Sequence, residues 1–217
     1  MILAAGRGDR MRPLTDNTPK PLLQVKGKPL IQYQLEKLVG AGIRDIVINH
    51  SVMGDQIETR FGNGRKLGAN ITYSAEGDMP LETGGGIFQA LPLLGSDPFI
   101  AINADIWTDY PYQDLPKTLT GLAHLILVKN PRHNPAGDFA IDDGYLSNQG
   151  TVRYTFSGIG VYSRELFRDC SNGVFPLAPV IRRAADERRV TAGFYQGMWM
   201  DIGTPERLHE LSVLLEK

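Results

Sequence analysis

The sequence of 217 residues has very few groups for disulfide or zinc chemistry. Its single cysteine, Cys170, cannot form a disulfide within the chain, so nothing requires an oxidising compartment. Its four histidines lie far apart, and with one cysteine they give no zinc-ligand spacing. We interpret the cysteine as a packing residue and the histidines as structural or surface residues.

An excess of charge and long hydrophobic runs are also missing. Lysine and arginine number 23 against 24 aspartates and glutamates, a formal net charge of -1. Without a global basic field, nucleic acid is not an expected partner. No apolar run reaches the length of about 18 residues that a membrane span needs, and the apolar stretch 1–6 is too short for a signal peptide. We expect a cytoplasmic protein without membrane contact, a monomer or a homodimer, and the sequence leaves open whether residues precede Met1.

The hydrophobic fraction of 42% and the charged fraction of 22% are those of a globular chain. Short β-branched runs alternate with helical patterns in the first 130 residues. Strands are predicted at Ile2–Ala5, Ile43–Asn49, Asn70–Ser74, Phe99–Asn103 and Ala123–Val128, and helices at Leu30–Val39, Gln56–Phe61 and Ile87–Leu91. This alternation predicts βαβ units and a Rossmann-like, mostly parallel sheet flanked by helices.

The pattern is looser after Asn130. It predicts a hairpin of Asp138–Ile141 with Tyr145–Leu146, strands at Tyr154–Tyr162 and Val190–Tyr195, and a helix at Leu177–Glu187. Thr204 is a good N-cap for a last helix that carries Leu208, Leu211 and Leu215. We therefore expect an α/β fold with a small β-rich lobe.

The segment 3–20, LAAGRGDRMRPLTDNTPK, carries the strongest chemical signal. It follows a predicted strand and contains two glycines, three arginines and a lysine. Glycines expose backbone N–H groups that can form an anion-binding nest, and arginine and lysine add charge-assisted bonds to phosphate. A dinucleotide fingerprint fails because Met11 replaces its third glycine, and no P-loop occurs. The loop predicts triphosphate binding.

The stretch 3–31 closely resembles the opening of the sugar-1-phosphate nucleotidyltransferase family. The shared pattern is a glycine-rich loop with an arginine, then Pro-Lys-Pro-Leu, then Gly-x-Pro-Leu-Ile. The resemblance continues through LETGGG at 81–86, NAD at 103–105, VKNP at 128–131, FSGI at 156–159 and WMDIGT at 199–204. Segments 81–94, 107–110, 121–124 and 175–179 most resemble the branch that transfers uridylyl groups to N-acetylmuramate 1-phosphate.

The resemblance implies roles for four residues. Arg10 and Lys20 would contact the phosphates, and Asp105 and Asp201 would hold Mg²⁺. Asp105 directly follows a predicted strand, and ligands of open α/β sheets lie at the C-terminal strand edge. Because both reactants are anions and the nucleophile is already ionised, positioning and electrostatic stabilisation should carry the rate.

Further site residues follow from position in the family pattern. The nucleotide is expected at Leu3, Ala4, Ala5, Gly6, Gly8, Asp9, Arg10, Lys20, Glu76 and Gly84, and the sugar phosphate at Asn103, Lys129, Gly137, Asp138, Ser157 and Trp199. The run Gly84-Gly85-Gly86 has two interpretations. It is a permissive helix start capped by Thr83, or it allows close backbone approach to a nucleobase. We expect one domain, with a nucleotide-binding half at 1–130 and a sugar-binding half with a closing helix at 131–217.

The leading hypothesis is transfer of UMP from UTP to N-acetylmuramate α-1-phosphate, with release of pyrophosphate, in cell-wall sugar recycling. The alternatives are guanylyl or thymidylyl transfer to mannose, heptose or glucose 1-phosphate. Two other classes are a metal-dependent glycosyltransferase of similar fold and a non-catalytic nucleotide sensor. The chain ends soon after residue 204, so no appended acetyltransferase activity is expected.

Overall fold

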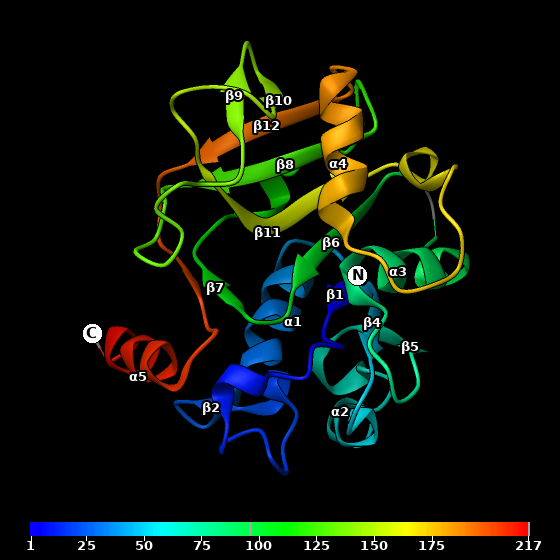
Figure 1. Ribbon diagram of the computed structural model, residues 1–217. Helices are drawn as coiled ribbons and strands as arrows, with labels where there is room; N and C mark the ends of the chain where they lie inside the picture. Colours follow the sequence, from blue (N-terminus) through cyan, green and yellow to red (C-terminus); the bar gives the residue numbers. More distant parts are fainter. Residues whose placement is uncertain (96, 217) are drawn as a thin grey trace.

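A computed structural model describes residues 1–95 and 97–216, and its centre is one large sheet (Figure 1). Within these residues the sheet has nine strands in the order β5-β4-β1-β6-β11-β8-β12-β10-β9. These strands are β1 (Ile2–Leu3), β4 (Asp45–His50), β5 (Asn70–Ala75), β6 (Phe99–Asn103), β8 (Ala123–Val128), β9 (Ala140–Asp142), β10 (Tyr145–Ser147), β11 (Thr155–Tyr162) and β12 (Val190–Tyr195). Two small ribbons pair β2 (Gln24–Val25) with β3 (Lys28–Pro29), and β7 (Ile106–Thr108) with β13 (Trp199–Asp201).

The first four strands of the sheet are all parallel, as the βαβ pattern predicted. β1 lies between β4 and β6, with Leu3 level with Asn49 on one side and Asn103 on the other. The C-terminal ends of these strands therefore meet at one edge, which is where ligands of such sheets bind. The expected bounds of these strands agree with the structure to within two residues.

The β-rich second half continues the same sheet. β11 runs antiparallel between β6 and β8, and β12 runs parallel to β8. The hairpin of β9 and β10 forms the far edge, and both residues of its turn, Asp143 and Gly144, have positive φ. Asp-Gly is the sequence that such tight turns favour, so this hairpin was readable from the sequence.

Five helices of the described chain cover the two faces of the sheet or flank it (Figure 1). They are α1 (Leu30–Gly40), α2 (Gly54–Phe61), α3 (Glu82–Ala90), α4 (Leu177–Asp186) and α5 (Pro205–Leu214). Ile102 in β6 packs with side chains of α1 and α2, while its neighbour Ala101 packs with those of α3 and α4. Alternate residues of a strand point to opposite faces of the sheet, and helices cover both faces. Each strand therefore needs apolar residues at successive positions, which explains the continuous apolar runs in the sequence.

The last two helices follow the predicted signals. The Thr204 side chain caps α5 by accepting a hydrogen bond from Arg207 N, with Pro205 in the first turn. Leu211 of this helix is fully buried in a third cluster with Met11 and Ile202. That contact fixes α5 beside the loop that follows β1.

The interpretation of Thr83 as a helix cap is wrong. α3 begins at Glu82, Leu81 occupies the cap position, and no side chain caps this helix. A Cβ atom on Gly84 would lie 2.5 Å from the Phe175 ring, and one on Gly85 would lie 2.2 Å from the Gly173 carbonyl oxygen. The glycine run therefore lets α3 pack closely against the segment before α4.

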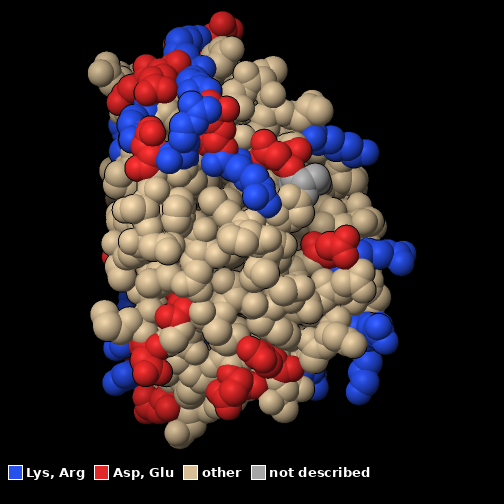
Figure 2. All heavy atoms as spheres, turned by 90° about the vertical axis from the view of Figure 1, so that its right-hand side faces the viewer, with Lys and Arg blue, Asp and Glu red and all other residues tan. Residues whose placement is uncertain are grey.

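The face of the molecule that carries α3 is shown in Figure 2. Acidic and basic side chains are mixed at its upper end, mainly acidic ones lie at its lower end, and most of the area between them is uncharged. Within the described residues, no helix combines the length and the apolar character needed to cross a bilayer.

Candidate active site

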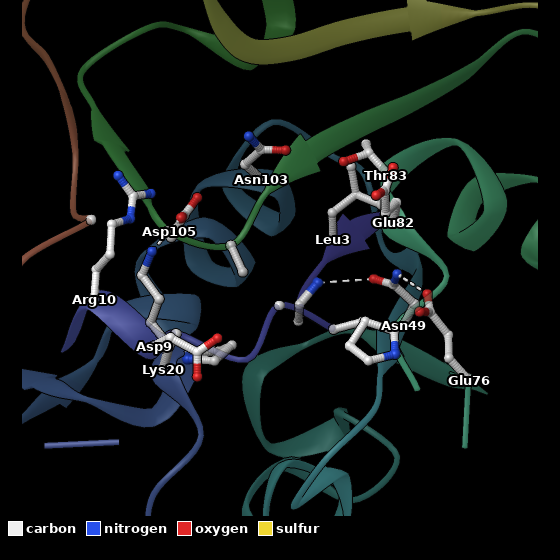
Figure 3. Close-up of a pocket in the computed structure, with 18 residues that line it drawn as sticks. Leu3, Asp9, Arg10, Lys20, Asn49, Glu76, Glu82, Thr83, Asn103 and Asp105 are labelled. Carbon is white, nitrogen blue, oxygen red and sulfur yellow. Dashed lines mark hydrogen bonds and ion pairs between the residues drawn. The ribbon is translucent and has the colours of Figure 1, made fainter. Parts of the chain in front are cut away.

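A cavity of about 440 Å³ opens at the C-terminal ends of β1, β4 and β6 (Figure 3). That volume lies within the range of small-molecule sites, roughly 300–1,000 Å³. Its walls come from the loop after β1, the segment before α3 and the turn between β6 and β7. The lining residues are Leu3, Ala4, Ala5, Gly6, Gly8, Asp9, Arg10, Lys20, Pro21, Asn49, Glu76, Pro80, Glu82, Thr83, Asn103, Ala104, Asp105 and Gly203.

The loop after β1 is shaped around Gly8. This residue has a φ of +69°, and the Thr15 hydroxyl and Met11 N–H both donate to its carbonyl oxygen, at 2.9 and 2.8 Å. A Cβ atom here would lie 3.0 Å from Lys20 Cβ, so only glycine fits both the backbone and the space. The loop thus brings its backbone N–H groups, the exposed Arg10 and the buried Lys20 to one wall.

Lys20 and Asp105 form an ion pair at this wall of the cavity. The Lys20 ammonium group donates to Asp105 Oδ2, and the lysine side chain is only 10% exposed. Lysine is rarely buried unless it is paired, so the carboxylate explains the burial. Figure 3 shows both head groups facing the cavity beside Arg10.

A polar network under the opposite wall holds the cavity in shape. Asn49 Oδ1 accepts a hydrogen bond from Ala4 N at 2.8 Å, and its amide nitrogen donates to Glu76 Oε1 at 2.6 Å. The second oxygen of Glu76 accepts from Leu81 N at 2.7 Å. Glu76 lines the cavity as expected, but its carboxylate already ties β4 to the start of α3.

The second predicted metal ligand, Asp201, lies beside the first. In the ribbon of β7 and β13, Asp201 is paired with Ile106, and Ile202 N donates to the Asp105 carbonyl oxygen at 2.7 Å. Arg207 Nη1 donates to Asp201 Oδ2, and His133 Nε2 lies 3.1 Å from Asp201 Oδ1. Asp201 is not among the residues that line the cavity, although Gly203, two positions on, is.

These carboxylates suit a hard divalent cation. Mg²⁺ binds through one or two carboxylates together with substrate phosphates, and an aspartate keeps free lone pairs when it accepts one cationic donor on an oxygen. Within residues 1–95 and 97–216, no group of three or more acidic, histidine or cysteine side chains could hold a metal by itself. An ion at Asp105 and Asp201 would therefore need phosphate oxygens to complete its ligands.

Nine of the ten predicted nucleotide residues line the cavity. The exception is Gly84, which is buried in α3 against Phe175. Of the six predicted sugar-phosphate residues only Asn103 lines it. Asp138 accepts from Phe156 N at 2.8 Å, the Ser157 hydroxyl donates to the Ile126 carbonyl oxygen at 2.7 Å, and the Trp199 indole donates to the Ser157 carbonyl oxygen at 2.9 Å.

The remaining two residues of that set lie on the segment between β8 and β9. Lys129 is exposed, and Gly137 is packed against the backbone of residues 153–154. Five of the six candidates thus surround the antiparallel part of the sheet rather than the cavity.

Sequence reasoning missed Asn49, Glu82, Arg207 and the contact of His133. Asn49 could have been found, because it ends a predicted parallel strand as Asn103 does. Arg207 gave no such signal, since an arginine in the first turn of a terminal helix is common on solvent-exposed faces. Only the folding of α5 against the β7–β13 ribbon brings it to Asp201.

The chain matches a known family and several known proteins. Residues 1–141 match the family model described as nucleotidyl transferase. The chain is 49% identical to the N-acetylmuramate alpha-1-phosphate uridylyltransferase of Neisseria meningitidis serogroup B, over 99% of this chain and 96% of that protein. It is 33% identical to the protein of the same name from Caulobacter vibrioides, over 95% and 92%.

A more distant relative acts on another pair of substrates. The Danio rerio mannose-1-phosphate guanylyltransferase catalytic subunit beta is 30% identical, over 95% of this chain and 61% of that protein. Among solved structures, a Bacillus anthracis protein in complex with sucrose has a TM-score of 0.85 at 23% identity, covering 98% of this chain and 93% of that one. The inositol-1-phosphate CTP transferase of T. maritima has a TM-score of 0.80 at 18% identity, covering 100% and 94%.

The two structural likenesses concern the fold alone. The family model covers well over half of the chain and includes the loop after β1, Lys20 and Asp105. This chain therefore belongs to the nucleotidyl transferase family.

Proposed function

We propose that this protein transfers UMP from UTP to N-acetylmuramate α-1-phosphate and releases pyrophosphate. The observation that carries the proposal is the 49% identity, along almost the whole of both chains, to a uridylyltransferase of that name. The cavity supports it, because cationic side chains and backbone donors suited to phosphates gather at one end, while Pro80, Glu82 and Thr83 line the other. We also propose that residues 1–217 act as one domain, with the nucleotide held mainly by residues 1–130.

The reaction forms one phosphoanhydride bond and breaks another. A phosphate oxygen of the sugar 1-phosphate attacks the α-phosphorus of UTP. The bond between the α-phosphorus and the oxygen of the β-phosphate breaks, and its electron pair stays on the departing pyrophosphate. Because the attacking oxygen is ionised, no general base is needed. The enzyme must hold two anions in line and stabilise the negative charge of the transition state.

We assign that work to the loop after β1 and to Lys20. N–H groups of residues 6–10 would hold the β- and γ-phosphates, with the Arg10 guanidinium over the charge on the transferred phosphate. Lys20, now on Asp105, would turn toward the oxygen that bridges the separating phosphates. The buried stem of Lys20 supports this, since it keeps the ammonium group at the cavity wall.

Asp105 and Asp201 would hold Mg²⁺. When bound, the ion supplies neutralisation of phosphate charge and a fixed relative orientation of the two substrates. Arg207 and His133 would keep the Asp201 carboxylate in place, because each contacts a different oxygen of it.

A panel of nucleoside triphosphates and sugar 1-phosphates tests the proposal. UTP with N-acetylmuramate α-1-phosphate should give the highest kcat/KM, measured by pyrophosphate release with Mg²⁺. Guanylyl transfer to mannose 1-phosphate is the alternative, since the Danio rerio relative carries that name. A higher kcat/KM for GTP than for UTP would overturn the proposed base, and transfer from a finished UDP-sugar without pyrophosphate chemistry would overturn the class.

A further inference from the structure

Glu82 is the first residue of α3 and lines the cavity away from the cationic wall. Figure 3 shows Glu82 and Thr83 at one end of the cavity, with Arg10, Lys20 and Asp105 at the other. The Glu82 residue is exposed, so its carboxylate is available to a ligand in the cavity.

The backbone of Glu82 is unusual for a glutamate. Its φ is +58°, in the left-handed region that L side chains rarely adopt. Such strain persists only where the surroundings hold it, and it is concentrated at ligand sites. An interaction of the carboxylate with the helix N-terminus does not explain it, because a glutamate with ordinary helical φ has the same interaction.

Contacts on both sides fix this conformation. Leu81 N donates to Glu76 Oε2 at 2.7 Å just before Glu82. Just after it, Gly85 N donates to the Phe175 carbonyl oxygen at 3.0 Å, and Phe175 N donates to the Leu81 carbonyl oxygen at 3.2 Å. The segment cannot rotate freely, so the Glu82 side chain is held at the cavity.

Four carboxylates line the cavity in the described chain, and three have partners there. Asp105 pairs with Lys20, Glu76 bonds to Asn49 and Leu81 N, and Asp9 lies 3.6 Å from Arg12. No hydrogen bond or ion pair joins the Glu82 carboxylate to any residue of 1–95 and 97–216. A carboxylate accepts hydrogen bonds and repels phosphate, so the part of a nucleotide that suits Glu82 is a neutral hydrogen-bond donor.

We infer that Glu82 is a specificity-determining residue that accepts a hydrogen bond from the nucleoside of the bound triphosphate. The inference rests on the proposed function, which places the phosphates at Arg10 and Lys20. Two groups share the required chemistry. They are the 2′-hydroxyl of the ribose and the N3–H of the base.

Nucleotide binding without the sugar phosphate tests this, because no turnover occurs. Calorimetric titration with UTP should give a Kd that rises by roughly ten- to a hundredfold in Glu82→Ala, the range for loss of a hydrogen bond to a charged group. Glu82→Gln keeps a carbonyl acceptor and should fall between. Titration with 2′-deoxy-UTP and with N3-methyl-UTP identifies the donor, because Glu82→Ala should have little further effect on the analogue that lacks it.

Glu82→Gly separates this role from a structural one. Glycine removes both the carboxylate and the strain, so this variant should bind UTP as weakly as Glu82→Ala while melting about 2–4 °C higher than wild type. The matched control is Asp143→Gly, a residue with φ of +49° in the β9–β10 turn, which should leave the Kd unchanged.

The possible failures are distinct. If wild-type protein does not bind UTP, the proposed function is overturned, and this inference with it. If wild type binds UTP and Glu82→Ala binds it equally well, only the role of Glu82 is overturned. An effect of Glu82→Ala that is equal for UTP and both analogues would also contradict a hydrogen bond from the nucleoside.

Discussion

The loop after β1 and the segment after β8 leave the central sheet at the same edge, yet their polar groups have different surroundings. Around the first, Arg10, Lys20 and Asp105 line an open cavity. Around the second, Asp138 and Ser157 are bonded to backbone groups of the protein itself. The charged groups of the first region are therefore accessible to a ligand in the cavity, whereas the polar groups of the second bond to the strands of the protein itself.

The largest effect is expected at Asp105. Asp105→Asn removes the negative charge that would hold Mg²⁺ and that now balances Lys20, so Mg²⁺-dependent turnover should be lost while the fold is kept. Pyrophosphate release measured against Mg²⁺ concentration, with circular dichroism for the fold, checks this. Unchanged turnover would contradict the assignment of Asp105 as a metal ligand. It would also remove the difference between the cavity around the loop after β1 and the region after β8.

Lys20→Ala should lower kcat/KM by about a hundredfold or more, the scale for removing transition-state electrostatic stabilisation. Lys129→Ala is the matched variant, since Lys129 is an exposed cation at the start of the segment after β8. Lys129→Ala should lower kcat/KM much less than Lys20→Ala, and the change should appear only in the KM for the sugar phosphate. A larger loss at Lys129 than at Lys20 would reverse the comparison.

A moderate effect on stability is expected at Gly84. A Cβ atom here would lie 2.5 Å from the Phe175 ring and 2.8 Å from the Phe175 carbonyl oxygen, so backbone must move. Gly84→Ala should cost about 1–3 kcal/mol of unfolding free energy, as overpacked sites do. Urea denaturation measures it, with Gly40→Ala in α1 as control, because nothing lies within 4 Å of a Cβ there. Equal stability of the two variants would contradict the close packing of α3.

The smallest effect concerns His124, on the antiparallel side. Burial lowers the pKa of His124, whose ring accepts or donates a 2.8 Å hydrogen bond with the Thr191 hydroxyl. The unfolded chain therefore binds a proton more readily below a pH of about 6.5, and unfolding free energy should fall as pH drops through that value.

Denaturation of wild type and His124→Gln at pH 7.5 and 5.5 isolates this contribution. The variant should lose less stability between the two pH values than wild type, because the glutamine at position 124 does not titrate. Equal losses would show that the ring is not held neutral by its surroundings.

Much of the fold was predictable because its signals are local. The parallel strands are continuous apolar runs, Asp143-Gly144 marks a tight turn, and Thr204 with Pro205 marks a helix start. The cap at Thr83 was wrong because packing decided that helix start. The backbone of Phe175, which is distant in sequence, forms hydrogen bonds with Leu81 and Gly85. These bonds fix the start of α3 at a residue that the local capping preference does not predict.

For the site, the sequence by itself determined which loop is predicted to bind phosphate, since two glycines and several cations share one loop after a strand. It also supplied Asp105, because strand ends of a parallel sheet meet at one edge. Only the tertiary structure decided that Asp201 lies beside Asp105 with Arg207 and His133 on its carboxylate, and that Glu82 is held at the cavity in a left-handed backbone. The physical reason is that these placements depend on contacts between segments far apart in the chain, which no local pattern encodes.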